Sequence, residues 1–372
     1  MSYVVHPSSD TVTVDVVPFA DVPAAWEPAW RDLAQRAAEP APFAESWFLR
    51  PSLEHLAPPS GGRLLAAWQG PTLIGVIALA TARRYGRIPT RHVQNWQHYH
   101  SFLGTPLIRS GAERAFWEAL LAELDDADWA PSFLHLCGMV EGGPVLAALR
   151  DVRRTDIVHR AERAFLHSDL SPDAYYQANI RKKKRKEIGR LQARLREVGP
   201  VSCERLADDG AIADWTNAFL EVEASGWKGR GRTALRDDPA TARFFREALA
   251  GAHAVGKLEM LRLTVDGRAI AMLVNLITAP GSFSYKIAYD EAFARYSPGV
   301  LIQIENLNIL DRPGIDWMDS CAVEDHAMIN SIWAERREIV RVTVPLRGKR
   351  RTLAFNVCRA LENASAALRG AA

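Results

Sequence analysis

The chain has 372 residues, of which 46 are basic and 44 acidic, and hydrophobic residues make up 48%. A chain of this length can bury two cores of ordinary domain size. Because the opposite charges nearly cancel, no bulk basic field indicates a nucleic-acid-binding protein, so local charge clusters carry the information instead. The four cysteines are widely spaced and form no C-x-x-C pair, which argues against a zinc site or a disulfide framework and fits a reducing compartment.

The sequence shows no segment typical of export or of membrane insertion. Met1–Val17 lacks a basic stretch followed by a long apolar one, so we expect no signal peptide. The apolar run Ile270–Ala279 is interrupted by Asn275 and is too short to span a bilayer. His98 and His100 lack a third ligand nearby, so no metal is expected. We expect a cytoplasmic protein, with peripheral association at the inner membrane face as a second expectation.

The first half predicts alternating strands and helices. Strands are expected where polar and apolar residues alternate, helices where apolar residues recur on one face, and turns at Gly and Pro. The elements are strand Thr11–Val17, helix Ala24–Ala38, strands Arg63–Trp68 and Leu73–Thr81 with a turn at 69–71, helix Ala112–Leu124 and strand Phe133–Leu136. The charged stretch Asp151–Asp169 lacks clear periodicity and is the candidate domain boundary.

The second half opens with a strong helix start at Ser171-Pro172-Asp173. Six consecutive cations, Arg181–Lys186, then begin a helix with an apolar stripe formed by Ile188, Leu191, Leu195 and Val198, and Gly199-Pro200 ends it. Further along come helix Asp214–Ala224, a basic Gly-rich loop at 226–231, helix Arg243–Ala254, and strands Lys257–Val265 and Ala269–Ile277 around the turn Asp266-Gly267.

A strand that runs into a helix, Ser284–Leu310, is the part of the sequence most suggestive of a ligand site. Ser284–Tyr289 alternates like a strand with one exposed face, and Asp290–Tyr296 connects it to a helix. Ser297-Pro298-Gly299 predicts a helix start with a hydroxyl cap and Pro at the first helical position. The unpaired N–H groups of a helix start suit a pyrophosphate or a carboxylate.

The two halves share an order of elements. Gly62-Arg63-Leu64, the turn at Gly70, Ile74-Gly75 and a helix after Thr105-Pro106 correspond to Gly256-Lys257-Leu258, the turn at Gly267, Ile270-Ala271 and a helix after Ser297-Pro298. The gaps differ by several residues, so the repeat is weak. It is consistent with a duplicated domain.

Several motifs in the second half carry a family resemblance. They are the basic helix Arg181–Gly199, the loop Ser225-Gly226-Trp227-Lys228-Gly229, the hairpin Asp266–Ala271, the segment with Tyr285, Lys286, Tyr289 and Asp290, and the Ser-Pro-Gly helix start. In this order and spacing, over about Ser171–Val344, the sequence resembles bacterial GNAT-superfamily proteins of the CelD-like and FemAB-like group.

The resemblance implies an α/β fold of two tandem GNAT-like domains, each a mixed, mostly antiparallel sheet flanked by helices. We expect a degenerate N-terminal domain at 1–165, an acyltransferase domain at 166–345 that opens with the basic helix, and a basic amphipathic tail helix at 346–372. Proteins of this group resemble N-acyltransferases of cell-envelope or exopolysaccharide synthesis. The acceptor expected on this basis is an amino sugar or a peptide precursor, small or lipid-linked.

The expected donor is acetyl-CoA or another acyl-CoA, held by Arg295, Ser297, Gly299, Val300 and Leu301. This loop departs from the R-x-x-G-x-G/A pattern of CoA-binding GNAT domains, because Pro298 and Val300 stand where small residues are expected. Pro298 has no N–H to donate. FemAB relatives use aminoacyl-tRNA, so the loop leaves the donor open.

The densest set of candidate catalytic groups lies at Asp316–Trp333. N-acylation requires a held thioester or ester, a polarised carbonyl and a base for the attacking ammonium. Asp319 is expected near a strand end, followed by Asp325 and His326 on a turn. The hypothesis is that His326 or Asp319 is the base and that Asp325 or Glu324 orients the imidazole. The alternative is a capping Asp and a surface His.

Other residues are candidates for binding substrate or anions. Tyr285, Lys286, Tyr289 and Asp290 are candidates for the acceptor pocket, and Trp227 and Lys228 for a phosphate or sugar clamp. In the basic helix, Lys182, Lys183, Arg185 and Lys186 would bind phosphates of a nucleotide-sugar, a lipid-linked sugar, anionic lipids or tRNA; a solvated face is the alternative. The tail, with Arg347–Arg351 and the amphipathic 353–368, would contact an anionic membrane or a cyclic dinucleotide.

Two functional alternatives stay open. One is a FemAB-like aminoacyltransferase that uses aminoacyl-tRNA, which predicts salt-sensitive tRNA binding through Arg181–Lys186. The other is a non-catalytic effector with the same fold that binds a nucleotide second messenger or a partner. The acyl-CoA hypothesis predicts thermal stabilisation by acetyl-CoA.

Overall fold

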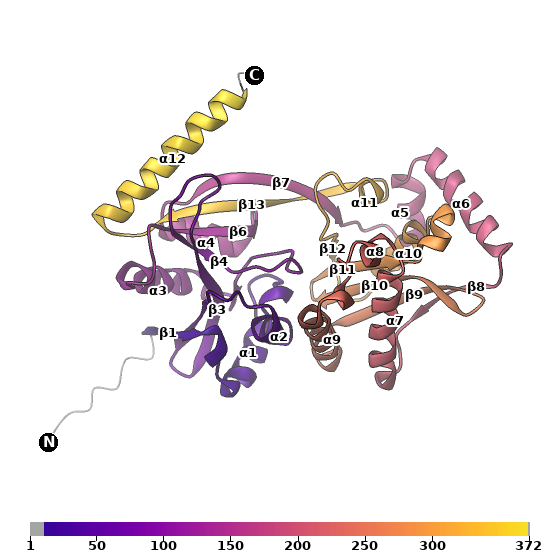
Figure 1. The fold of residues 1–372 in the computed structure, drawn as a ribbon, viewed down its shortest axis with the longest axis horizontal. Coiled ribbons are helices and arrows are strands. Elements are labelled where there is room, and N and C mark those ends of the chain that lie inside the picture. The colour runs from indigo at the N-terminus through magenta and orange to yellow at the C-terminus, as the bar shows by residue number, and fades with distance from the viewer. Residues whose placement is uncertain (1–10, 371–372) are drawn as a thin grey trace. The chain divides into compact units, whose positions relative to one another are not determined.

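The computed structural model describes residues 11–370, which divide into two compact units (Figure 1). Within this range, unit 1 contains the residues up to Ser46, Ala57–Arg160 and the residues from Ile339 on. Unit 2 contains Trp47–Leu56 and Ala161–Glu338. Two strands, β7 (Asp156–Leu166) and β13 (Glu335–Pro345), each begin in one unit and end in the other.

The sheet of unit 1 is mixed and mostly antiparallel. Its strands are ordered β1-β2-β3-β4-β6-β13, and only β4 and β6 pair in parallel. The strands are β1 Val12–Pro18, β2 Arg63–Gln69, β3 Thr72–Ala82, β4 His92–Asn95 and β6 Phe133–Val140, with the short β5 Leu107–Ile108 paired to β3. The helices are α1 Glu27–Gln35, α3 Glu113–Asp126 and α4 Pro144–Val152.

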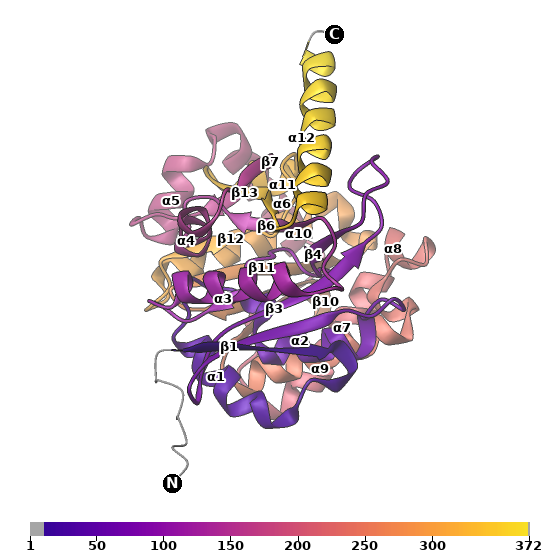
Figure 2. The same ribbon diagram turned by 90° about the vertical axis from the view of Figure 1, so that its left-hand side faces the viewer.

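Helix α3 covers one face of this sheet (Figure 2). Its buried face contains Phe116, Trp117 and Leu120, spaced as an amphipathic helix requires. A Cβ at Gly75 of β3 would overlap the ring of Phe116, so the glycine lets the helix approach the strand closely. The core of unit 1 therefore lies between this helix and the sheet.

The C-terminal helix α12 (Lys349–Gly370) packs on unit 1 through one side. Phe355 and Cys358 are buried, and the Phe355 ring lies 5.9 Å from that of Phe133. Arg351 donates to the carbonyls of Leu124, Asp125 and Ala127, at the C-terminus of α3, where a cation complements the helix dipole. The predicted tail helix is therefore present, and one face of it is buried.

The sheet of unit 2 repeats the pattern of unit 1. Its strands are ordered β8-β9-β10-β11-β12-β7, and only β11 and β12 pair in parallel. They are β8 Val201–Arg205, β9 Leu258–Val265, β10 Arg268–Thr278, β11 Gly281–Tyr289 and β12 Trp317–Asp319. The turn Asp266-Gly267 between β9 and β10 has positive φ at both residues, as the sequence predicts for a tight hairpin.

The helices of unit 2 flank this sheet. They are α5 Pro172–Asn179, α6 Lys182–Arg196, α7 Ile212–Ala224, α8 Trp227–Arg230, α9 Pro239–Ala254, α10 Pro298–Glu305 and α11 Ala327–Asn330, together with the 3-10 helices η6 Glu291–Tyr296 and η7 Asn306–Asp311. Ile188, Leu191 and Leu195 of α6 are buried as predicted, but Val198, expected in the same stripe, is exposed beyond the end of α6. The expected loop at 226–231 contains α8.

The shared strand order confirms the predicted fold class, α/β with two tandem domains that each contain a mixed, mostly antiparallel sheet flanked by helices. β2 and β3 of unit 1 correspond to β9 and β10 of unit 2, as the sequence repeat predicts. Each unit then adds a parallel strand after a helix, β6 after α3 and β12 after α10, and closes with an antiparallel strand.

The unit boundaries differ from the predicted domains 1–165, 166–345 and 346–372. Residues from Ile339 on lie in unit 1 because β13 pairs with β6 there. The stretch Asp151–Asp169, predicted as a boundary segment, is largely β7, which links the units as a strand. No helix among residues 11–370 is long and apolar enough to cross a membrane.

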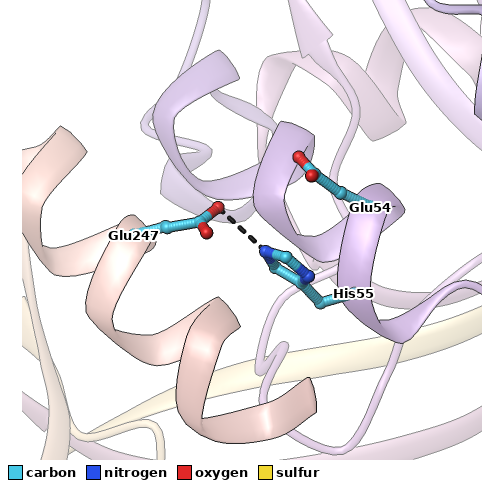
Figure 3. Close-up of side chains that lie close together, drawn as sticks. All are labelled: Glu54, His55 and Glu247. Atoms are coloured by element: carbon cyan, nitrogen blue, oxygen red, sulfur yellow. Dashed lines mark ion pairs between the residues drawn. The ribbon is translucent and has the colours of Figure 1, made fainter. Parts of the chain in front are cut away.

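Helix α2 (Ser46–Leu56) comes from the first half of the sequence, yet Trp47–Leu56 belong to unit 2. Phe48 is 1% exposed, and its ring lies 5.3 Å from Phe244 and 5.8 Å from Tyr285. Figure 3 shows the other contact of this helix, in which His55 Nε2 lies 2.9 Å from a carboxylate oxygen of Glu247 on α9.

Glu54 brings a second carboxylate close to His55 and Glu247 (Figure 3). Both glutamates are exposed, so water solvates their charges. The three side chains lie together because the His55–Glu247 ion pair joins α2 to α9 at the surface.

The burial of Phe48 predicts which contact holds α2 in unit 2. Phe48→Ala should destabilise unit 2 by about 3–5 kcal/mol, because it removes a buried ring and leaves a cavity. Glu247→Ala, the matched control at the exposed ion pair, should cost at most about 1 kcal/mol. Urea unfolding followed by tryptophan fluorescence measures both; equal shifts in the unfolding midpoint would contradict this account.

Candidate functional site

The parallel strands β11 and β12 separate in unit 2, and this point defines the candidate site. They pair through Gly281–Trp317, Ser282–Met318 and Phe283–Asp319. β12 ends there, whereas β11 continues to Tyr289 beside β10. Ligands of α/β sheets bind beyond the carboxyl ends of parallel strands, where neighbouring connections diverge. The edge of β11 beyond Phe283 is such a place.

A β-bulge lies on β11 at the same point. Val274 of β10 pairs with Lys286, but the next residue, Asn275, pairs with Ser284, so Tyr285 has no residue opposite it. A bulge takes one residue out of the ladder and changes the direction of its side chain and peptide groups. It therefore turns the backbone near Tyr285 away from regular pairing with β10.

Lys286 follows the bulge and has an unusual environment. Burial lowers the pKa of its ammonium to about 8, and the carboxylate of Glu223 partly opposes this shift. Glu223 on α7 is itself buried; it lies 2.7 Å from Lys228 Nζ and accepts the Leu235 N–H at 2.8 Å. Lys286 thus lies near a buried carboxylate, Glu223, and a second ammonium group, Lys228, with both lysines half-buried.

Cys321 and Tyr285 complete the surroundings of Lys286. Cys321 follows β12 with a φ of 54°, a strained value for a residue with a side chain. Burial, with the negative charge of Asp319, raises the pKa of its thiol, so the thiol is neutral at ordinary pH. Burial likewise raises the pKa of the Tyr285 hydroxyl. Of these groups, only Lys286 can change protonation near neutral pH.

The equivalent point in unit 1 is closed by a side chain. β4 and β6 pair in parallel at Val93–Leu134 and Gln94–His135, and Asn95 follows. The buried Asn95 carboxamide donates to the carbonyls of Gly104 and Cys137 and accepts the Cys137 N–H. These bonds join the strands where their counterparts in unit 2 separate. Unit 2 therefore has the better geometry for a ligand.

The predicted donor loop differs from its expected geometry. Ser297 has a φ of 50°, and its hydroxyl caps nothing; its carbonyl instead accepts the N–H groups of Val300 at 2.9 Å and Leu301 at 3.2 Å. Gly299 and its two successors are buried, while Arg295 is exposed and lies over the Tyr296 ring. Val300 and Leu301 thus use their N–H groups inside the helix. α10 ends at Glu305 and continues as η7, where the sequence predicts one helix to Leu310.

Asp319 lies in an ion-pair cluster. It is fully buried, and Arg163 Nε lies 2.8 Å from its Oδ1, while Arg337 Nη1 lies 3.0 Å from its Oδ2. The Cys321 N–H donates to Oδ1 at 2.8 Å. With both oxygens engaged, Asp319 fixes the end of β12 and is poorly suited to take a proton from a substrate.

The other predicted catalytic residues lie on the turn before α11. His326 Nδ1 accepts the Ile329 N–H at 3.5 Å and so caps this short helix. Asp325 and Glu324 are exposed. The alternative expected a capping Asp and a surface His, but the cap here is the half-buried His326 itself. The proposed imidazole–carboxylate pair stays a prediction.

Among the predicted substrate-binding residues, Tyr285, Lys286 and Lys228 belong to the cluster described above. Tyr289 is 38% exposed. Asp290 is buried, pairs with Arg268 and caps η6 by accepting the Ala292 N–H at 2.9 Å, so its role is structural. The side chain of Trp227 lies outside the described part of the structure.

The basic helix α6 separates into residues with different environments. Arg185 donates to the carbonyls of Gln177 and Ile180 at the end of α5, so it is used in the fold and is not available as predicted. Lys182 and Lys186 are exposed. Lys183 lines a pocket together with Arg181 and Lys184, two residues absent from the predicted set.

Sequence reasoning missed Glu223, Arg163 and Arg337. Each is a charged residue in an element whose pattern reveals nothing about its partner. Glu223 gave one signal: it falls on the otherwise buried face of α7, with Phe219, Leu220 and Ala224 also buried. A charge on an apolar helix face indicates a buried partner.

Part of unit 2 matches a known protein family. Residues 182–326 match the family model described as acetyltransferase (GNAT) domain, a span that includes β11, β12 and α10. The predicted resemblance and the predicted enzyme class, an acyltransferase, are confirmed by this match. A search of curated protein sequences gives no match.

Solved structures share this fold over most of the chain. FemX is 10% identical with a TM-score of 0.54, and the match covers 90% of this chain and 98% of that one. The C-terminal domain of a putative lysylphosphatidylglycerol synthetase from Agrobacterium fabrum is 11% identical with a TM-score of 0.53 (91% and 96% covered). A protein of unknown function from Bacteroides thetaiotaomicron is 13% identical with a TM-score of 0.52 (87% and 98%).

The Asp319 cluster predicts a large stability effect. Asp319→Ala should destabilise unit 2 by about 3–5 kcal/mol, because it removes the carboxylate from two arginines that are themselves largely buried. Asp325→Ala, an exposed aspartate nearby in the sequence, should change stability by less than about 0.5 kcal/mol. Urea unfolding of the two variants tests this; an Asp319→Ala protein as stable as wild type would contradict the structural role.

Proposed function

We propose that unit 2 is an N-acyltransferase whose reaction takes place where β11 separates from β12, with Lys286 as the group that accepts the proton. The observation that carries the proposal is the lysine itself, which lies next to a bulge at an open strand end and has a pKa lowered to about 8. A base is most effective when its pKa lies near the working pH. The match of residues 182–326 to a GNAT domain supports this reaction class.

The reaction requires one base and one polarised carbonyl. The acceptor ammonium loses a proton to neutral Lys286, and the freed amine attacks the donor's acyl carbon. A C–N bond forms as the C–S or C–O bond of the donor breaks, and the leaving thiolate or alkoxide takes a proton, for which the Lys286 ammonium is the source. The attacking nitrogen loses its second proton to water as the amide forms. The products are therefore an amide, a free thiol or hydroxyl and one released proton, and the lysine is neutral again.

The remaining groups of the site support this step. The bulge at Tyr285 directs backbone groups out of the ladder, where an N–H can stabilise the negative charge on the carbonyl oxygen. The Glu223 carboxylate holds Lys228 and opposes the fall of the Lys286 pKa, so it adjusts how readily the base is neutral. The neutral thiol of Cys321 adds no charge.

The proposal also names the acyl donor and the acceptor. An acyl-CoA is the donor that we propose, and an amino sugar or a peptide precursor of the cell envelope or of exopolysaccharide is the acceptor. FemX and the putative lysylphosphatidylglycerol synthetase share the fold. Two alternatives remain, an aminoacyltransferase that uses aminoacyl-tRNA and a non-catalytic effector, and they differ in the group that is transferred. The first transfers an amino acid from tRNA, and the second transfers nothing.

Replacement of Lys286 tests the proposal. Lys286→Met should lower kcat/KM by about 10²–10⁴-fold. In the wild type, kcat/KM should rise with pH through a midpoint near 8, because the lysine must be neutral to accept a proton and its pKa is about 8. Thiol release from a panel of acyl-CoAs with amino-sugar and peptide acceptors, and transfer from aminoacyl-tRNA, measure the activity.

Two controls make the test specific. Lys286→Arg keeps a cation that does not lose its proton, so it should be as inactive as Lys286→Met. His326→Ala should retain wild-type turnover, since His326 caps α11. An active Lys286→Arg protein would show that charge, and not proton transfer, is what the site supplies, and loss of activity in His326→Ala would restore the imidazole hypothesis.

We also propose that α12 docks on an anionic membrane surface. Leu353, Val357 and Leu361 are exposed at 66%, 48% and 51%, one helical turn apart, and the exposed Lys349 and Arg350 precede them. An exposed apolar stripe beside cations suits an interface of anionic headgroups and acyl chains. The cyclic dinucleotide expected as an alternative ligand would use the cations but not the stripe.

Liposome sedimentation tests this docking. Val357→Glu/Leu361→Glu should reduce binding to vesicles that contain phosphatidylglycerol by at least about tenfold, because the charges oppose insertion of the stripe. Asn356→Glu/Asn363→Glu, on exposed positions of the same helix, adds the same charge and should reduce binding less. Equal losses, or a wild-type protein that dimerises through α12 without binding vesicles, would contradict membrane docking.

A further inference from the structure

Unit 2 contains a pocket of about 540 Å³ at the start of the basic helix α6. One side is formed by Arg181, Lys183, Lys184 and Glu187, and the other by the segment from Ala327 to Ala334, including Trp333. The volume suits a small ligand. The two walls share a neighbour, because α6 and α11 both pack against α10.

The charges on the α6 wall are arranged unfavourably for the protein alone. The first turn of α6 contains three lysines and no acidic residue, although the N-terminus of a helix carries the positive end of its dipole. Arg181 stands at the N-cap position and makes no capping bond with its side chain. Lys184 pairs with Glu187 at 3.4 Å, which offsets one of these charges. An anion in the pocket would meet the cations and the N–H groups of the helix together.

The opposite wall contributes an independent observation. Trp333 is 1% exposed, and its indole Nε1–H has no hydrogen-bond partner among the described residues. Buried indole N–H groups normally have an acceptor, because an unmade hydrogen bond costs free energy. Trp333 lines the same pocket as the cations. An acceptor atom of a ligand there would satisfy a donor that the protein leaves without one.

We infer that this pocket binds the diphosphate group of a substrate. A diphosphate supplies several charges and many acceptor oxygens in a small volume, which matches two or three cations, a helix N-terminus and one indole donor. The site differs from the expected donor loop at 295–301, where Val300 and Leu301 use their N–H groups within α10. The elements on its two walls, α6 and α11, both contact α10.

This inference deepens the proposed function, since a diphosphate is present in two kinds of substrate that an N-acyltransferase of this type would use. One is the CoA of the donor, and the other is a nucleotide-linked sugar acceptor. The pocket cations recognise the group they share. Binding of a diphosphate requires no acyl transfer, so the inference and the catalytic role of Lys286 can fail separately.

Calorimetric titration of the full-length protein with inorganic pyrophosphate, CoA and UDP-N-acetylglucosamine tests the site. Arg181→Ala/Lys183→Ala should weaken binding by at least about tenfold, which corresponds to about 1.4 kcal/mol. Lys182→Ala/Lys186→Ala is the matched control: it removes the same charge from the same segment, at two equally exposed positions that do not line the pocket, and should weaken binding less than about twofold. Trp333→Phe should weaken binding several-fold while keeping most of the side-chain volume.

The outcomes separate the sources of the diphosphate. Pyrophosphate binding that depends on Arg181 and Lys183 and is displaced by CoA supports the donor as its source; displacement by the nucleotide-sugar alone supports the acceptor. Equal losses in the two double variants would show a diffuse surface effect and overturn the inference. So would binding of tRNA alone, with no affinity for any of the three small probes.

Discussion

The carboxylate of Asp319, buried between Arg163 and Arg337, is the interaction on which the candidate site depends. It joins the end of β12 to β7 and to the first part of β13, and its Oδ1 accepts the N–H of Cys321. That hydrogen bond fixes the residue at which β12 stops, with Cys321 at a strained φ. Buried charges are costly unless they are paired and hydrogen-bonded, and this cluster meets both conditions. β12 therefore ends at a defined residue, and β11 continues beyond it paired only with β10.

The two units show that topology alone does not make a site. Both contain antiparallel strands followed by one parallel strand, and in both a helix precedes that strand. In unit 1 the carboxamide of Asn95 bonds to the backbone of the neighbouring strand, and a Cβ at Gly104 would overlap the Cys137 carbonyl. The same position in unit 2 has a bulge and a lysine with a lowered pKa. In unit 1 the junction is closed by side-chain hydrogen bonds, whereas in unit 2 it is left open.

The sequence predicts the local features of this molecule well. The hairpin at Asp266-Gly267, the start of α5 at Ser171 and the buried face of α6 follow from turn residues, caps and apolar spacing, which act over a few positions. The strand β11 was also predictable from its alternation, and so was the presence of Lys286 on it. These are the features for which neighbouring residues supply most of the energy.

What could not be predicted depends on contacts between distant residues. Asp319 pairs with Arg163, 156 positions away, so its carboxylate looks like a free base in the sequence and is a structural group in the fold. The many charges of β7 indicate a domain boundary in the sequence, but in the structure this segment pairs with β12 and is a strand. Ser297 is a residue type that commonly caps a helix N-terminus through its hydroxyl. Here it has a left-handed φ and makes no such bond, because η6 ends at the same residue. In each case tertiary context overrides a local preference.

Positively charged side chains gather at two places in unit 2, near Lys286 and at the start of α6. Lys286 and Lys228 share one buried carboxylate, and the start of α6 has three lysines beside the positive end of a helix dipole. Both arrangements cost free energy in the isolated protein, and an anion that binds only the folded state offsets such a cost by mass action. They also differ in the protonation state that their surroundings favour. The α6 charges line a pocket, where Arg181 and Lys183 stay exposed to solvent, whereas burial around Lys286 favours a neutral amine that can exchange a proton. The two arrangements also belong to different helices of unit 2, because α6 and the pocket segment at α11 pack on α10, whereas Lys286 lies near Glu223 of α7.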